Sequence, residues 1–404
     1  MGATFLLALI LYLDRAALSV LAPAIRQDLG LDALELGWVF SAFVWGYALF
    51  HIPAGWLGDR YGPRGVLAII VILWSFFTAA TARARTFASL MAIRFLFGAA
   101  EAGAAPNVSR SFARWIPFGE RARAQGVFFA GMSAGGALAP PLATVLLVHL
   151  GWKAAFLMLG GFGAVWALAW YCWYRNDPQT HPAVNAAELE LIAPQGEAAA
   201  PAPEIAWSRL LRKSNLWALL LMYFTYGYTG YIYITWFPTY LREARHLPVS
   251  LAGFLASVPS LLGMAAKPLG GWWSDRLTRL RGVVLGRRLV GVCGFSLGAL
   301  AVLPGIMVSD PFLAVLFLAA ADAGAALAHG VCFAVCLDVG MRRAGTLSAL
   351  MLTMGSLGNA ASALAFGGFL EYSNSWAPPF LIAMAANLAG ALLWLKIDPR
   401  EQLA

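Results

Sequence analysis

Charge is scarce in this sequence: only 12% of its 404 residues are Asp, Glu, Lys or Arg, whereas 60% are hydrophobic and 16 are tryptophans. A typical soluble domain carries about 25% charged residues. The composition therefore excludes a set of soluble domains, because too few charged groups are available to cover their surfaces. It indicates an integral membrane protein instead.

Cysteine and histidine are also rare, with four and five residues respectively. All four cysteines fall inside apolar segments, where they are not placed to form an external disulfide. Cys332 and Cys336 are one helical turn apart without further ligands in the nearby sequence, so we expect small membrane-facing residues rather than a metal site. The sequence also has no phosphate-binding glycine loop and no Ser/His/Asp spacing. We therefore expect no metal, no cofactor and no enzymatic activity.

Long apolar segments recur along almost the whole chain. A helix needs about 20 apolar residues to cross a hydrocarbon core of roughly 30 Å, and this criterion predicts an all-α membrane protein with twelve transmembrane helices. The first segment has no basic residues before its apolar run, so we interpret it as a helix rather than a signal peptide. The predicted spans are residues 2–24, 36–57, 65–82, 87–109, 123–148, 154–174, 215–241, 249–273, 287–308, 312–336, 344–369 and 376–395.

The net charge of +8 is distributed unevenly between alternate loops. With both termini in the cytoplasm, the inward loops hold most of the Lys and Arg residues. The outward loops then hold only Arg26, Arg83, Arg85, Lys153, Arg242 and Arg245. This asymmetry follows the positive-inside rule. We predict a multi-pass protein of a bacterial inner membrane with both termini cytoplasmic, surrounded by lipid and without a nucleic-acid partner.

One long polar segment divides the predicted helices into two sets of six. Residues 176–214 are rich in Ala, Pro and Glu, which is typical of a linker, and one short surface helix is expected around residues 186–192. The flanking halves, residues 1–175 and 215–404, look like repeats, because the Gly, Trp and Phe of residues 131–156 recur 224 positions later. Many secondary transporters are built from duplicated units of this kind.

Two similar motifs lie at the predicted cytoplasmic ends of helices 2 and 8. They read "GWLGDRYGPR" and "GWWSDR". An acid is unfavourable at the C-terminus of a helix because of the helix dipole, so we expect each Asp to pair across helices; the alternative is that the motifs are only topology signals. The candidate cytoplasmic gate residues are Asp59, Arg60, Arg64, Asp275 and Arg276.

The first of these motifs resembles the signature of the major facilitator superfamily in the loop between helices 2 and 3. Within that superfamily, "YLDRAALSVLAP", "FSAFVWGYALFHIPAGWLGDRYGPR", "RFLFGAAEAGAAPN" and "TWFPTYL" together resemble the anion:cation symporter branch. The resemblance covers the whole chain. It implies the major facilitator fold, alternating access and proton-coupled import of a sugar acid, such as a hexonate or hexuronate, or of another small organic anion.

Charged residues inside the predicted helices are few, and each is unfavourable there by about 2.5–3.5 kcal/mol at the helix centre. At a rise of 1.5 Å per residue, Asp14 lies roughly 18 Å from the cytoplasmic end of helix 1. Arg94, on the antiparallel helix 4, lies at about the same level as Asp14 and Arg15. Glu101 is two turns further along the same face as Arg94. These four groups converge near the middle of the membrane if helices 1 and 4 face one cavity.

Such a group fits an anion site that is coupled to protons. Arg15 and Arg94 offer planar guanidinium groups that bind carboxylate through two hydrogen bonds. Asp14 and Glu101 offer proton sites, because a guanidinium that engages substrate changes its effect on a neighbouring carboxyl group. The family resemblance implies the same roles. The alternative is a buried ion-pair network that only joins helix 1 to helix 4.

Three further residues are candidates for substrate binding. Tyr12 lies one turn before Arg15 in the sequence, and Tyr47 resembles a cavity tyrosine of the family. Asn359 is a substrate contact by resemblance, whereas an interhelical hydrogen bond is the alternative.

The second half has charged residues of its own. Asp322 and His329 are seven residues apart and fit either a second proton relay or a structural pair. We expect Lys267 to pair or to extend toward the membrane surface near Asp275.

The substrate class is narrowed by one departure from the family pattern. Gly131 is followed by Met132, where many sugar-acid carriers of this branch have Gln, and this favours a smaller, apolar or aromatic carboxylate. The main alternative function is a drug:proton antiporter that exports small lipophilic compounds. Those carriers have a "GPxxGG" run that "GMSAGGALAPP" lacks, and two central arginines would repel a cation. We expect a monomer whose partners are a small organic anion and the proton.

Overall fold

The computed structural model describes residues 1–117, 120–192, 210–340 and 344–402, and the side chains at positions 52, 55, 59, 121, 122, 344 and 345 are also outside the description. Within these ranges the chain forms helices and no strand. It folds as two compact units, which are described separately. Unit 1 comprises Met1–Leu31 and Ala42–Ala200, and unit 2 comprises Asp32–Ser41 and Pro201–Ala404.

Ten of the described helical segments are long and apolar enough to cross a membrane. One of them, α6, covers two of the predicted spans, because it extends from Arg121 to Trp173. It changes direction at Gly151, which has a φ of 77°, a backbone conformation that glycine adopts readily. The 22-residue helix α9, Ser214–Thr235, is an additional apolar helix beyond these ten. The structure is thus all-α, as predicted, and consistent with twelve spans.

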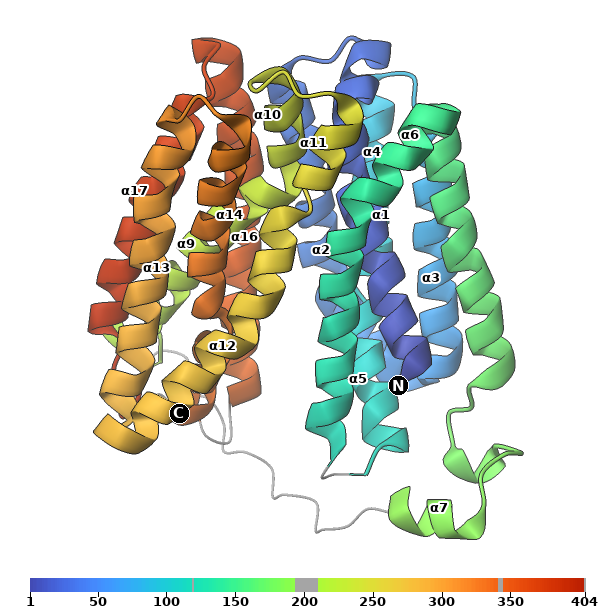
Figure 1. The fold of residues 1–404 in the computed structure, drawn as a ribbon. Helices are drawn as coiled ribbons and strands as arrows, with labels where there is room; N and C mark the ends of the chain where they lie inside the picture. Colours follow the sequence, from blue (N-terminus) through green and yellow to red (C-terminus); the bar gives the residue numbers. More distant parts are fainter. Residues whose placement is uncertain (118–119, 193–209, 341–343, 403–404) are drawn as a thin grey trace. The chain divides into compact units, whose positions relative to one another are not determined.

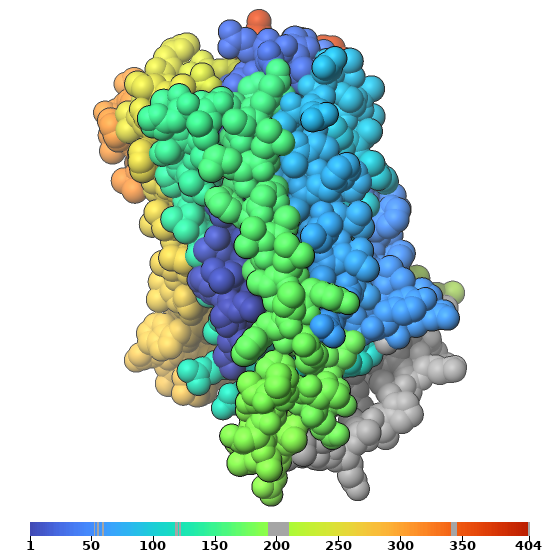
Figure 2. Space-filling model, turned by 90° about the vertical axis from the view of Figure 1, so that its right-hand side faces the viewer, coloured from blue at the N-terminus to red at the C-terminus, as the bar shows by residue number. Residues whose placement is uncertain are grey.

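Unit 1 is built around the packing of α6 against α1 and α3. Two glycines make this contact close, because a Cβ atom at Gly131 or Gly135 of α6 would meet the main-chain carbonyl of Phe5 or Leu9 in α1. Figure 2 shows one side of this packing, with the end of α6 (green) beside α1 (dark blue) and α3 (blue). The helices of unit 1 (Figure 1) are α1 Gly2–Leu29, most of α2 Ala33–Tyr61, α3 Pro63–Thr81, α4 Phe87–Glu101, α5 Ala104–Trp115, α6 Arg121–Trp173, the short 3-10 helix η2 Pro178–Thr180 and α7 Ala186–Ile192.

Unit 2 has an aromatic core. Trp236 stacks on Phe366 with ring centroids 5.1 Å apart, and Phe366 meets Phe380 edge to face at 5.5 Å. Phe40, at the start of α2, also packs on Trp236. The helices of unit 2 (Figure 1) are α9 Ser214–Thr235, α10 Phe237–Glu243, α11 Val249–Leu255, α12 Val258–Arg281, α13 Val283–Met307, α14 Pro311–Leu327, α15 His329–Gly340, α16 Ala344–Ser373 and α17 Ala377–Lys396.

Two sequence predictions about unit 2 are wrong. Cys332 and Cys336 do not face the membrane but lie fully buried in the core of this unit, because cysteine packs as a small apolar side chain. The motif around Asp275 is not at a helix end, since α12 continues to Arg281 and stops at Gly282 with φ of 88°. Apolar length indicates where a helix leaves the membrane, whereas the helix itself continues through residues such as Arg and Leu that favour it.

The predicted linker helix is confirmed as α7, Ala186–Ile192. Most of the remaining linker, residues 193–209, lies outside the described residues.

Candidate functional site

An ion pair between α1 and α4 lies at the centre of unit 1. Arg15 of α1 donates from both Nε and Nη2 to Oε1 of Glu101 in α4. The Glu101 side chain is fully buried, and that of Arg15 is 21% exposed. Glu101 Oε2 has no hydrogen-bond partner within the described part of the chain. One carboxylate oxygen is therefore held by Arg15 while the other is open to a proton.

A second acid and a second base lie in the same region. Asp14 of α1 is 1% exposed and Arg94 of α4 is 3% exposed. Asp14 interacts electrostatically with Glu101 and Arg94, and its Oδ2 accepts a hydrogen bond of 3.4 Å from Thr78 Oγ1 in α3. The structure thus brings together the four charged residues that were singled out in the sequence, and three helices supply the groups around them.

Aromatic rings surround both guanidinium groups. The Arg15 guanidinium lies 4.8 Å from the ring centre of Tyr47, 5.3 Å from Tyr12 and 4.9 Å from Phe43. The Arg94 guanidinium lies 5.4 Å from the same Phe43 ring. Aromatic faces attract cations at these distances. Phe43 was missed in the sequence, although its position one helical turn before Tyr47 places both on one face of α2.

Glycine contacts between α2 and α4 allow these side chains to meet. A Cβ atom at Gly98 of α4 would overlap the carbonyl of Phe43, and one at Gly46 of α2 would overlap the carbonyl of Phe95. The two helix backbones are therefore nearly in contact. This close approach sets the side chains of Phe43 and Tyr47 beside those of Arg94 and Glu101.

The four charges balance, with two carboxyl and two guanidinium groups. A carboxylate that enters and binds Arg15 competes with Glu101 for the guanidinium. If Glu101 takes a proton at the same time, the total charge of the region does not change. Charge balance matters here because an uncompensated charge in a membrane interior is strongly unfavourable.

Asn359 lies in unit 2 and takes part in an interhelical contact. With its amide nitrogen turned toward α9, it donates to the carbonyl oxygens of Gly227 at 2.9 Å and Gly355 at 3.2 Å. This is the structural alternative raised from the sequence, and a contact of Asn359 with substrate stays a prediction.

The charged residues in the middle of unit 2 form a separate group. Lys267 of α12 interacts electrostatically with Asp322 of α14 and with His329 of α15. Within the described residues Lys267 makes no ion pair with Asp275, and its extension toward the membrane surface stays a prediction. The face that a residue occupies on its helix, and not only its distance along the helix, decides which groups it meets.

The predicted gate residues have different environments. The side chain of Asp59 lies outside the described residues. The guanidinium of Arg60 lies 5.5 Å from the rings of Trp56 and Tyr61. Arg64 donates through its guanidinium to the carbonyl of Tyr171 at 2.9 and 3.0 Å.

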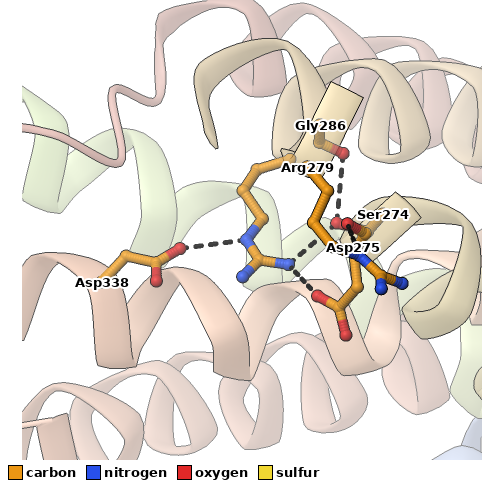
Figure 3. Close-up of polar contacts among 6 residues, drawn as sticks. Ser274, Asp275, Arg279, Gly286 and Asp338 are labelled. Carbon is orange, nitrogen blue, oxygen red and sulfur yellow. Dashed lines mark hydrogen bonds and ion pairs between the residues drawn. The ribbon is translucent and has the colours of Figure 1, made fainter. Parts of the chain in front are cut away.

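In unit 2 the gate motif forms an interhelical network (Figure 3). Asp275 of α12 does not pair with the adjacent Arg276 but accepts a hydrogen bond of 2.8 Å from Arg287 of α13. Arg287 also donates to Asp338 of α15 at 3.0 Å and to Ser274 at 3.0 Å. Neighbouring residues on a helix point about 100° apart, so Asp275 and Arg276 face different directions. Asp275 pairs with a residue of another helix, as the sequence predicted. Arg287 and Asp338 were not identified from the sequence.

Replacing Arg287 by Met should destabilise unit 2. The change leaves Asp338 and Asp275 without their guanidinium partner. Because the Asp275 side chain is 64% exposed and that of Asp338 is 26% exposed, we expect a loss of about 1 kcal/mol in the free energy of unfolding, mostly from Asp338. Denaturant unfolding of the purified protein measures this loss. Arg279→Met is the matched control, since Arg279 makes only a 3.4 Å contact with the Asp275 carbonyl. Equal stability of the two variants would contradict the importance of the network.

Known proteins resemble this chain in both sequence and fold. The family model described as Major Facilitator Superfamily matches residues 4–363. A probable sulfoacetate transporter of Cupriavidus necator is 33% identical over 402 residues, covering 99% of this chain and 93% of the relative. A hexuronate transporter of Bacillus subtilis is 34% identical over 308 residues, covering 75% and 71%, and a D-galactonate transporter of Escherichia coli is 31% identical over 406 residues, covering 97% and 93%.

Solved structures show the same fold. A bacterial homologue of the human lysosomal transporter Spinster, in an inward-facing and unoccupied conformation, matches with a TM-score of 0.77 at 21% identity, covering 98% of this chain and 94% of that structure. A D-xylose–proton symporter matches with a TM-score of 0.75 at 15% identity, covering 100% and 98%. At these identities the likeness establishes the fold alone.

Proposed function

Because the chain belongs to the major facilitator superfamily, in its anion:cation symporter branch, we propose that it imports a small organic carboxylate together with protons by alternating access. The observation that carries this proposal is the buried pair of Arg15 and Glu101, with Asp14 and Arg94 beside it. The relatives named above are a probable sulfoacetate transporter, a hexuronate transporter and a D-galactonate transporter, and all of these ions contain a carboxylate.

The substrate carboxylate binds Arg15 and Arg94. A guanidinium offers two parallel N–H donors to a carboxylate, so binding at Arg15 replaces the contact with Glu101. Glu101 then holds a proton on the oxygen that Arg15 has released. Substrate and proton leave together when the site opens on the other side of the membrane, and Glu101 returns to Arg15.

Asp14 is the second acid of this cycle. It is held by Thr78 and lies within electrostatic range of Arg94. Engagement of Arg94 by substrate withdraws positive charge from Asp14, as engagement of Arg15 does for Glu101. Asp14 is therefore the proposed second proton site.

The environment of Arg15 supports a substrate with an apolar or aromatic body. The rings of Tyr12, Phe43 and Tyr47 lie within 5.3 Å of the guanidinium, and the sequence has Met132 where many sugar-acid carriers of this branch have Gln. An organic anion that presents a carboxylate to Arg15 and carbon atoms to these rings matches both features. We propose this class ahead of heavily hydroxylated sugar acids.

A ligand-stabilisation experiment tests the proposed function. The purified protein is heated with sugar acids, aromatic carboxylates, short monocarboxylates and lipophilic cations, each at two pH values. Only ligands that prefer the folded state raise the melting temperature, so we expect a carboxylate to do so in a pH-dependent way. The increase should disappear in Arg94→Ala and persist in the control Lys153→Ala, whose side chain is 56% exposed. Stabilisation by a cation without any effect of Arg94 would replace this proposal with an exporter.

We further propose that the protein acts as a monomer in a bacterial inner membrane with both termini in the cytoplasm. The distribution of Lys and Arg between alternate loops supports this orientation. A cysteine-labelling experiment from either side of the membrane tests the topology.

A further inference from the structure

We propose that unit 2 contains a second site for a carboxylate and a proton, in which Lys267 binds the carboxylate, Asp322 takes the proton and His329 adds a polar contact. The inference rests on the proposed function, since the carboxylate is taken to be one that the transporter carries. It extends that function to the second unit, whose charges have no part in the cycle above.

Lys267 is the central observation. It lies on α12, within a segment apolar enough to cross a membrane, and is partly buried. Among the described residues it makes no hydrogen bond and no ion pair within 4.0 Å. A Cβ atom at Gly330, next to His329, would lie 3.8 Å from the Lys267 carbonyl oxygen, and the charges of Lys267 and Asp322 interact. An ammonium in such a position is unfavourable by about 2.5–3.5 kcal/mol. A group that is retained there without a contact partner is suited to bind an anion.

Two other cations of unit 2, Arg245 and Arg287, have structural roles, because protein groups accept their hydrogen bonds. Arg245 donates to Tyr240 Oη at 2.6 Å and to the carbonyls of Val308 at 2.6 Å and Gly305 at 2.9 Å. Arg287 is held by the network of Figure 3. Both guanidinium groups are satisfied by protein partners, whereas the Lys267 ammonium has no contact partner in the part of the chain that the structure describes.

The groups around Lys267 come from several helices. Asp322 Oδ2 lies 3.5 Å from the position that a Cβ atom at Gly263 would occupy, so α12 and α14 are close at this level. The ring of His329 lies 5.4 Å from that of Tyr226, and its buried Nδ1 has no hydrogen-bond partner in the described part of the chain. Tyr233 of α9 interacts electrostatically with Asp322.

The two charged residues of α13 have other partners, since Arg287 donates to Asp338 and Arg288 donates to the carbonyl of Ile397. This helix meets α14 at Gly294 and Gly298, each of which lies against the backbone of α14. The titratable groups of the site are therefore Tyr226 and Tyr233 from α9, Lys267 from α12, Asp322 from α14 and His329 from α15.

Charge balance couples the two ligands. With Lys267 and Asp322 both ionised, the site is neutral. A carboxylate that binds Lys267 adds one negative charge, and a proton on an oxygen of Asp322 restores neutrality. The tautomer of His329 that carries its proton on Nδ1 donates a hydrogen bond to the same carboxylate. Since a net charge inside the membrane is unfavourable, carboxylate and proton bind together.

Transport in proteoliposomes tests the proposal, with a trapped pH dye to count protons and a labelled carboxylate to count substrate. The carboxylate is the one that stabilises the purified wild-type protein. Asp322→Asn should lower the number of protons per carboxylate relative to wild type, because the Lys267 site then takes its carboxylate without a proton. Lys267→Met should raise the KM about 10- to 100-fold, the range for losing a charged hydrogen bond, and Lys267→Arg should restore most of the affinity. The control Lys213→Met removes an exposed lysine paired with Glu401 and should change neither quantity.

The outcomes separate this proposal from the proposed function. A wild-type protein that moves no protons with carboxylate would contradict the function itself. Coupled transport in the wild type, with an unchanged proton count in Asp322→Asn and an unchanged KM in Lys267→Met, would overturn only the second site. The double variant Lys267→Met with Asp322→Asn removes both charges together and serves if a single variant does not fold. It should transport with a raised KM, and a wild-type KM there would also overturn the proposal.

Discussion

Replacement of Glu101 by Gln is expected to abolish proton-driven accumulation of substrate, so that the internal substrate concentration no longer rises above the external one. Gln has nearly the same shape as Glu but does not titrate, so the exchange of Arg15 between Glu101 and substrate no longer moves a proton. The uncompensated Arg15 should keep its affinity for carboxylate, and the dependence of that affinity on pH should become weaker, since only Asp14 still titrates. Uptake into proteoliposomes with an imposed pH gradient measures the first effect, and binding at two pH values measures the second.

Exchange of labelled substrate provides the internal control for this experiment. Exchange across the membrane needs no net proton movement, so Glu101→Gln should retain it while losing accumulation. The matched variant Glu35→Gln changes a partly exposed acid at the start of α2, whose side chain accepts from Asp32 N, and should behave as wild type. Proton dependence in Glu101→Gln equal to that of the wild type would refute the role of Glu101.

Replacement of Gly98 by Ala should strongly destabilise unit 1. The added Cβ atom meets the main-chain carbonyl of Phe43, and a backbone atom cannot move aside as a side-chain end can. Overpacking of this kind lowers stability by about 1–3 kcal/mol, although Ala normally stabilises a helix relative to Gly by about 1 kcal/mol. Because α4 carries Arg94 and Glu101, a shift of this helix should also weaken substrate binding.

Gly161→Ala is the matched control for Gly98→Ala. Gly161 also lies within a helix, α6, but a Cβ atom there would have no neighbour within 4 Å. Denaturant or thermal unfolding, followed by tryptophan fluorescence, should show Gly161→Ala at or above wild-type stability and Gly98→Ala clearly below it. If both variants were equally stable, the close approach of α2 and α4 would not matter for the fold.

The helices themselves were largely predictable from the sequence. The predicted span 65–82 corresponds to α3, Pro63–Thr81, and the predicted linker helix is α7. Apolar length and helix-breaking Gly-Pro pairs are local properties of the chain, so they are visible without tertiary contacts. Helix ends beyond the apolar part were less accurate, as α12 shows, because a helix does not stop where its hydrophobicity does.

The charged site was partly predictable for a similar reason. The helix has a constant rise per residue, so it gives the depths of Asp14, Arg15, Arg94 and Glu101 in the membrane. Charges are rare inside membrane segments, so these four residues were candidates for a functional site. Their roles as substrate and proton sites stay predictions, since geometry alone does not measure transport. The family resemblance was also visible in the sequence, and the comparisons confirm it.

The sequence by itself determined the class of protein, the approximate spans and the identity of the charges inside the membrane, because each of these depends on composition or on position along one helix. The tertiary structure decided which charges meet. Arg15 pairs with Glu101 rather than with its neighbour Asp14, Lys267 lies near Asp322 rather than Asp275, and Phe43 reaches both guanidinium groups. These partnerships depend on how each helix is rotated about its axis and how closely its neighbours approach, and only packing between distant parts of the chain sets those quantities.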